Sequence, residues 1–165
     1  MAETLDVFLS RPNWVPDHVE KHFNDFYPLL KKCGFNPRTI GKNVVPISSP
    51  FDHVIRVMES CDCTIVLGLP QMRIESGDIK GEPIDKPFSL PTEWNQIEAA
   101  ISIMLRKPTL MMAHKTISQR GIFERGAANV FVHEFTTMGR KWVHELEPKL
   151  EALREAVLYK KKHEI

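Results

Sequence analysis

The chain has 165 residues, of which 42% are hydrophobic and 26% are charged, a balance typical of one globular domain. Lys and Arg number 22 against 21 Asp and Glu, so the formal net charge of +1 gives no basic bias toward nucleic acid. Composition therefore excludes a largely disordered chain, a collagen-like repeat and a coiled-coil array as the main content.

The compartment is suggested by what the sequence lacks. No apolar run approaches the ~20 residues of a membrane span, and residues 1–6 contain two acids but no basic residue. Cys33, Cys61 and Cys63 have the spacing of neither a disulfide framework nor a zinc site, and Cys63 fits a buried strand position. We therefore expect a cytoplasmic protein with no membrane, nucleic-acid or metal partner.

The first elements along the chain alternate strand and helix. Residues 6–10 (DVFLS) are predicted as a short buried strand, and a helix begins with Asp17 as its cap. Gly34 is expected to end that helix in the left-handed conformation, and Pro28 predicts a kink or break inside it. The apolar stripe of the helix is formed by Val19, Phe23, Phe26 and Leu30.

The middle of the chain contains the clearest strand. Residues 35–40 are a weaker strand candidate, and residues 51–60 form an amphipathic helix. Residues 63–68 (CTIVLG) are continuously apolar and β-branched, as expected of a central parallel strand. The polar insertion 71–89 is predicted to lack regular structure, and a loop of that length is often a functional lid or an assembly segment.

A strong helix follows, from a cap at Thr92 to Arg106. Its predicted buried stripe is Trp94, Ile97, Ile101, Met104 and Leu105. Strands are predicted at 109–113 and 129–132, separated by a short segment at 121–126. The last helix runs over 139–163, with a bend or break at Pro148, and its apolar register is Trp142, Leu146, Leu150, Leu153 and Val157.

Five strands alternating with helices predict an α/β fold: a single domain, 1–165, with a doubly wound, flavodoxin-like, five-stranded parallel sheet. Its core spans about 6–135, and the C-terminal helix packs beside it. In such sheets ligands bind beyond the carboxyl ends of the strands. Here the loops after Ser10, Ile40, Gly68 and Ala113 build that edge.

Familiar catalytic motifs are missing. The sequence has no GxxxxGK[ST], no GxGxxG after the first strand, no HExxH and no CxxC. His18 and His22 are four residues apart on the first predicted helix, but two solvated histidines without a third ligand are more common than a metal site.

The most informative residue is Glu98, which lies at the margin of an apolar helix face near the carboxyl edge. A carboxylate there can bind ribose hydroxyls, and it can also stabilise or attack an oxocarbenium-like carbon. Glu93, one turn earlier, fits a first-turn acid that favours the helix dipole. The alternative for Glu98 is an ordinary surface glutamate in a salt bridge.

Several segments together resemble the TIR domain superfamily, including its bacterial immune members. They are strand 7–10 (VFLS), strand 63–67 (CTIVL), the segment 92–98 (TEWNQIE) with its Trp94-x-x-x-Glu98 spacing, and the strand entry 107–110 (KPTL). The resemblance implies that Glu98 is the catalytic residue of an enzyme that cleaves NAD and releases nicotinamide. NAD would be a substrate rather than a resident cofactor, and an anti-phage defence role would follow.

The same resemblance implies further contacts with the substrate. Ser10 and Arg11 would lie near the phosphates or the ribose, with Trp94 beside Glu98. Trp14 would stack on a base, although it could instead be a hydrophobic staple of the first helix. Arg73 is a candidate phosphate contact, or simply a solvated loop charge.

Residue Glu124 lies in the segment 121–126 (GIFERG), which is not a general TIR motif. It could be a second site carboxylate, or half of an exposed pair with Arg125.

The chain is also similar to nucleoside 2-deoxyribosyltransferase-like families, in which the corresponding Glu attacks the sugar C1′. Both families break an N-glycosidic bond at C1′, so that shared chemistry is the common expectation. The third possibility is a non-catalytic TIR interaction module. In each TIR reading we expect self-association, together with a separate sensor or effector protein.

Overall fold

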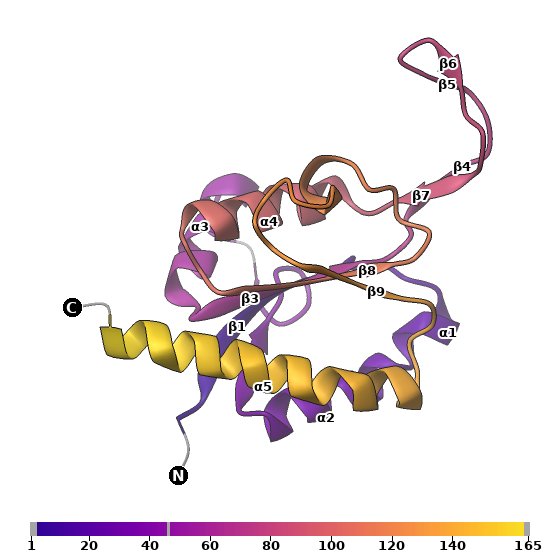
Figure 1. Cartoon of the computed structure of the whole chain (residues 1–165). Coiled ribbons are helices and arrows are strands. Elements are labelled where there is room, and N and C mark those ends of the chain that lie inside the picture. The colour runs from indigo at the N-terminus through magenta and orange to yellow at the C-terminus, as the bar shows by residue number, and fades with distance from the viewer. Residues whose placement is uncertain (1–2, 46, 164–165) are drawn as a thin grey trace.

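The computed structural model describes residues 3–45 and 47–163, and a parallel five-stranded sheet forms its centre (Figure 1). The spatial order of the strands is β2-β1-β3-β8-β9, which confirms the doubly wound, flavodoxin-like α/β fold. These strands are β1 (Leu5–Ser10), β2 (Phe35–Arg38), β3 (Cys63–Gly68), β8 (Thr109–His114) and β9 (Val132–Phe135).

The central strands are buried on both faces, which explains their continuous apolar sequence. In the register of the sheet, Leu9 of β1 lies beside Ile65 of β3, and Ile65 lies beside Leu110 of β8. Cys63 begins β3 and is fully buried, as predicted. β2 is shorter than expected and ends at Arg38, and Thr39 and Ile40 then lead away from the sheet.

Helices cover both faces of the sheet. In Figure 1, α2 (Phe23–Lys32) and α5 (Arg140–His163) lie on one face, and α3 (Pro50–Ser60) and α4 (Glu93–Met104) lie on the other. None of the helices in the described part of the chain is both long enough and apolar enough to cross a bilayer.

The first predicted helix is in fact two. The short α1 (Asp17–Glu20) follows Pro16, and the Asp17 side chain makes no capping hydrogen bond, so that prediction was wrong. The break lies between α1 and α2 rather than at Pro28, which sits inside a continuous α2. Pro28 is exposed, so the carbonyl oxygen of Asn24, which loses its amide partner, can bind water instead. Gly34 ends α2 with a φ of 80°, as predicted.

The last helix shows the same behaviour. The last helix is not divided in two at Pro148, because α5 runs without interruption through this exposed position. Its buried face is the predicted register of Trp142, Leu146, Leu150, Leu153 and Val157.

The site helix α4 differs from its predicted orientation. Thr92 caps it as predicted, with its Oγ1 accepting a hydrogen bond of 3.0 Å from the amide nitrogen of Asn95. The predicted burial of Trp94 and Met104 was wrong, because they are 38% and 82% exposed. Ile101 is buried as predicted, but the other buried side chains of the helix are small or polar, and these are Asn95, Glu98, Ala99 and Ser102. The helix ends two residues early because Arg106 takes a φ of 53°.

The insertion 71–89 is ordered rather than irregular. β4 (Met72–Ile74) pairs antiparallel with β7 (Phe88–Leu90), and β5 (Asp78–Ile79) pairs with β6 (Glu82–Pro83) at the tip. Figure 1 shows this arm projecting away from the sheet, so it does not form the expected lid in this conformation.

The start of the last strand was predicted three residues too early. β9 begins at Val132 rather than at Asn129, because Asn129 takes a φ of 52° and Phe131 is 73% exposed. The segment at 121–126 contains a short 3-10 helix, η1 (Gly121–Phe123), which packs its Phe123 ring under the sheet edge against β3 and β8 residues.

Candidate functional site

A cavity of about 430 Å³ opens at the carboxyl edge of the sheet, between the ends of β1 and β2 and the first turns of α3 and α4. This is the edge at which ligands bind in doubly wound folds. The cavity is lined by Leu9, Arg11, Pro12, Asn13, Trp14, Thr39, Ile40, Pro50, Val54, Gln71, Thr92, Trp94 and Glu98.

Glu98 lines this cavity from the second turn of α4 and is only 9% exposed. Burial raises the pKa of its carboxyl from 4.5 to about 7, and a hydrogen bond from the Ser10 side chain opposes that rise. Glu98 forms no ion pair within residues 3–45 and 47–163, so the alternative of a salt-bridged surface glutamate does not describe it. Near neutral pH the carboxyl is about half ionised, which suits a group that must attack or donate a proton.

Two buried polar side chains that do not line the cavity, Ser10 and Asn95, contact each other near Glu98. Ser10, at the end of β1, is 1% exposed, and Asn95 on α4 is also 1% exposed. The Nδ2 atom of Asn95 donates to the Ser10 Oγ at 2.8 Å and to the Ser10 carbonyl oxygen at 3.3 Å. Sequence reasoning missed Asn95, although a polar residue three positions before Glu98 on the same helical face was a usable signal.

Two exposed tryptophans line the cavity. Trp14 comes from the loop after β1 and is 67% exposed, and Trp94 comes from the first turn of α4. An exposed Trp is uncommon on a protein surface, and two beside one carboxylate provide flat faces on which a ring can stack. The exposure of Trp14 argues against its alternative role as a buried hydrophobic staple.

Arg11 lies on the cavity wall, but its guanidinium is directed into the protein. Its side chain has no exposed surface, and its Nη2 forms a 2.6 Å ion pair with Glu20 on α1. The guanidinium also lies 3.5 Å from the centroid of the Phe23 ring, and its Nε donates to the carbonyl oxygen of Pro12 at 3.0 Å. These contacts use the charge internally, so the geometry argues against the expected phosphate contact.

Two other sequence candidates lie away from the cavity. Arg73 is exposed on β4 of the arm and pairs with Glu75, and it does not line the cavity. Glu124 is exposed after η1, and its neighbour Arg125 pairs with Glu134 at 2.5 Å instead of with Glu124.

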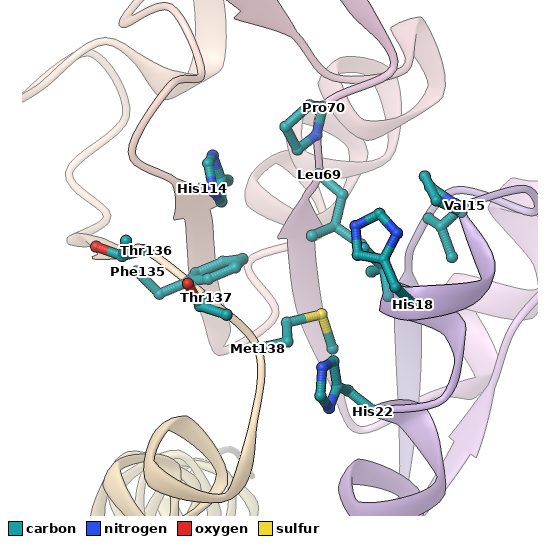
Figure 2. Close-up of a pocket in the computed structure, with 12 residues that line it drawn as sticks. Val15, His18, His22, Leu69, Pro70, His114, Phe135, Thr136, Thr137 and Met138 are labelled. Atoms are coloured by element: carbon teal, nitrogen blue, oxygen red, sulfur yellow. The ribbon is translucent and has the colours of Figure 1, made fainter.

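A second cavity, of about 340 Å³, lies on the α2 and α5 side of the same edge (Figure 2). His18 and His22 lie on one side of it and His114 on the other, and the side chain of Met138 lies close to His22. The prediction that His18 and His22 share one helix was wrong, because α1 ends at Glu20 and His22 lies at the start of α2.

The chemistry of this second cavity is limited. Burial lowers the pKa of His114, and its Nδ1 lies 2.8 Å from the Oγ1 of Thr116. No group of three His, Cys, Asp or Glu side chains is placed to hold a metal ion in the described residues. The lining residues that the structure describes include no carboxylate or thiol, so the Glu98 cavity is the better candidate for bond-breaking chemistry.

Comparison with known proteins gives a fold-level answer. No protein-family model matches the sequence, and no curated protein matches it. The CMP N-glycosidase BcmB of Clostridium botulinum is similar in structure, with a TM-score of 0.56 and 14% identity over 87% of this chain and 98% of that chain. A 2-deoxyribosyltransferase from Bacillus psychrosaccharolyticus has a TM-score of 0.50 and 15% identity, over 88% of this chain and 95% of that chain.

These two structures share the architecture of this chain, and each match covers nearly the whole length of the other protein. They support the similarity to the deoxyribosyltransferase-like fold, whereas neither of them is a TIR domain, so the TIR resemblance gains no support from them.

Proposed function

We propose that this chain is an enzyme that cleaves the N-glycosidic bond of nucleosides, with Glu98 as the nucleophile. The observation that carries the proposal is a buried carboxylate, Glu98, that lines a cavity at the ligand edge of the sheet together with two exposed tryptophans. The fold is shared with a CMP N-glycosidase and a 2-deoxyribosyltransferase, two enzymes whose names describe this class of reaction.

The reaction follows from the chemistry of a carboxylate at the sugar. An ionised Glu98 oxygen attacks C1′, the C1′–N bond breaks, and its electron pair leaves with the base, which takes up a proton. Water, or the ring nitrogen of a second base, then attacks C1′ and releases the carboxylate. Water gives hydrolysis, and a second base gives transfer. The ring of Trp14 or of Trp94 would stack on the base during either step.

The charge of the cavity favours an uncharged substrate. Among its described lining residues the one cation is Arg11, and its guanidinium is fully committed to Glu20 and neighbouring groups. A phosphate beside a partly ionised Glu98 would therefore meet repulsion with no compensating cation. Neutral nucleosides fit this cavity better than CMP or NAD, both of which bear phosphates.

The same argument weighs against the NAD-cleaving, TIR-like function in anti-phage defence, which requires a binding site for a pyrophosphate. A non-catalytic interaction module would not need to bury Glu98, whose burial disfavours its ionised form. Both remain predictions of the sequence, and the substrate panel described next includes the first of them.

The experiment is incubation of the purified chain with 2′-deoxynucleosides, ribonucleosides, CMP and NAD, with and without a free base, followed by chromatography of the products. We expect base release or base exchange from the uncharged nucleosides. A 2-fluoro nucleoside analogue should form an ester that mass spectrometry locates at Glu98.

Two variants sharpen the result. Glu98→Gln should lower the rate by a factor on the order of a thousand or more, because an amide cannot attack C1′. Glu93→Gln, on the exposed first turn of the same helix, is the matched control and should keep the wild-type rate. Base release that survives Glu98→Gln, or turnover of NAD alone, would contradict the proposal.

A further inference from the structure

We propose that the second cavity, which is lined by His18, His22 and His114, is a binding site for an uncharged heteroaromatic ring, namely a free nucleobase. The class of ring follows from the cavity. The choice of a nucleobase rests on the proposed function, because cleavage of an N-glycosidic bond releases a base and transfer consumes one. The site is distinct from the Glu98 cavity, since the two have no lining residue in common.

The two cavities are neighbours at the carboxyl edge of the sheet. In the loop after β1, Trp14 lines the Glu98 cavity and the next residue, Val15, lines the second cavity. After β3, Pro70 lines the second cavity and Gln71 lines the Glu98 cavity. Two short segments thus form walls of both cavities, so a base in the second cavity is held next to the proposed reaction site.

The size and the walls of the second cavity suit a small ring. Its volume of about 340 Å³ lies at the lower end of the range of about 300–1,000 Å³ that is common for small-molecule sites. Apolar side chains cover much of the wall, among them Val15, Leu69, Phe135 and Met138. A compound of one or two rings fits such a space better than a whole dinucleotide does.

The second cavity has no permanent charge to offer a ligand. Its described lining residues include no Lys, Arg, Asp or Glu. Burial also lowers the pKa of His114, which favours the neutral form of that imidazole. A phosphate or carboxylate placed there would lose water without gaining a fixed cation, so an uncharged ligand is favoured.

The imidazole of His114 is held in place before any ligand binds. The amide nitrogen of Thr116 donates to its Nδ1 at 3.3 Å, so Nδ1 carries a lone pair and the neutral ring has its proton on Nε2. The ring also packs edge-to-face on Phe135, with centroids 5.8 Å apart and planes at 84°. A wall that is already fixed loses little entropy when a ligand binds.

The other polar groups match the edge of a heterocycle. Figure 2 shows His18 and His22 on the side of the cavity opposite to His114. Their ring nitrogens and the hydroxyls of Thr136 and Thr137 can each donate or accept a hydrogen bond. A nucleobase carries both donors and acceptors around its rim, whereas a purely apolar molecule would leave these groups unpaired.

The test is an NMR titration of protein labelled with ¹³C in its histidine rings, at pH 8, with adenine, cytosine and uracil. We expect at least one base to shift the signals of His18, His22 and His114 saturably, with a Kd on the order of a millimolar or below. His144, exposed on α5 and outside the cavity, is the internal control and should not shift. Titration of all three bases without shifts at the cavity histidines would overturn the proposal.

A matched ligand tests the charge argument. Orotate is uracil with an added carboxylate, and it should bind about tenfold or more weakly than uracil because that group meets no permanent cation. Tighter binding of orotate would show that the cavity selects anions, and would contradict the assignment to an uncharged ring.

Cavity-filling variants locate the site. Thr137→Trp places a large ring at an exposed position of the wall and should abolish the shifts, and Pro70→Trp is the second variant if the new ring turns outward. Lys141→Trp, at an exposed position on α5 that lines neither cavity, is the matched control and should keep them. Shifts that persist in both cavity-filling variants would place the base elsewhere and refute the assignment.

The outcome is separable from that of the proposed function. Glu98→Gln should leave the shifts of the cavity histidines unchanged, and their loss in this variant would place the base in the Glu98 cavity instead. The titration needs no turnover, so a chain that binds bases here but cleaves no nucleoside would refute the proposed function and support this inference. A chain that cleaves nucleosides without shifts at these histidines would do the reverse.

Discussion

Replacing Glu98 with Gln should make the protein more stable, but only above about pH 5. The carboxyl is buried, and burial raises its pKa from 4.5 to about 7 in the folded chain. Below pH 4.5 both folded and unfolded chains hold the proton, and Glu98 then has no such penalty. Between pH 4.5 and 7 the unfolded chain loses the proton while the folded chain keeps it, so the free energy of unfolding falls as the pH rises.

The size of the effect follows from the two pKa values. A difference of about 2.5 units at ~1.4 kcal/mol per unit gives roughly 3 kcal/mol of destabilisation above pH 7. Gln has nearly the same shape and no charge, so Glu98→Gln should recover most of that free energy at pH 8 and little of it at pH 4. For a chain of this size the gain corresponds to a melting temperature about 6–12 °C higher.

The assay is urea denaturation of the wild type and Glu98→Gln at intervals between pH 4 and pH 8.5. The control is Glu93→Gln, an exposed position on the same helix, which should change the free energy of unfolding by about 0.5 kcal/mol or less. A difference between wild type and Glu98→Gln that is the same at pH 4 and pH 8 would show that Glu98 is not buried as a charged group.

Four other substitutions test the site and the contacts that hold it in place. Trp14→Ala and Trp94→Ala should each raise KM for a nucleoside by about fivefold or more through loss of a stacking face, while Phe131→Ala, an exposed aromatic outside the cavity, should not. Arg11→Met should lower the free energy of unfolding by about 2 kcal/mol in urea, because its buried charged hydrogen bonds are lost. Thr92→Ala should lower it by about 1 kcal/mol in the same assay, through loss of the helix cap.

The sheet was predictable from the sequence because its signal is local. Strand β3 is an apolar and β-branched run and β1 contains the apolar run 7–9, which is the pattern expected of strands buried on both faces. The C-terminal helix was equally clear, because its five buried positions repeat at helical spacing. The two prolines were misread because their effect depends on whether the freed carbonyl faces water, which the sequence does not state.

The faces of α4 could not be read from apolarity alone. A helix that packs closely on a parallel sheet presents small residues to it, and here Ala99 and Ser102 take that role. The apolar Trp94 is left at the cavity mouth, and the polar Asn95 points inward. A rule that buries the largest apolar side chains therefore rotates this helix away from its true orientation, although Glu98 still falls beside the cavity.

The direction of Arg11 could not be predicted because it depends on a helix break. The spacing between β1 and the following helix would place a guanidinium at the ligand edge, where it could bind phosphate. The break after Glu20 lets α1 turn its acid toward Arg11, and the pair forms inside the protein.

Arg11 instead contributes to the site by shaping the loop after β1. Its Nε is bonded to the Pro12 carbonyl, and its ion pair with Glu20 ties both ends of that loop together. Trp14 lies within the loop, between these two anchors. A stacking platform held in place before the ligand arrives loses less entropy on binding, which raises affinity without an added contact. The internal use of this arginine thus leaves no free cation among the described residues of the cavity and anchors the loop that carries Trp14, and both features suit an uncharged, ring-bearing substrate.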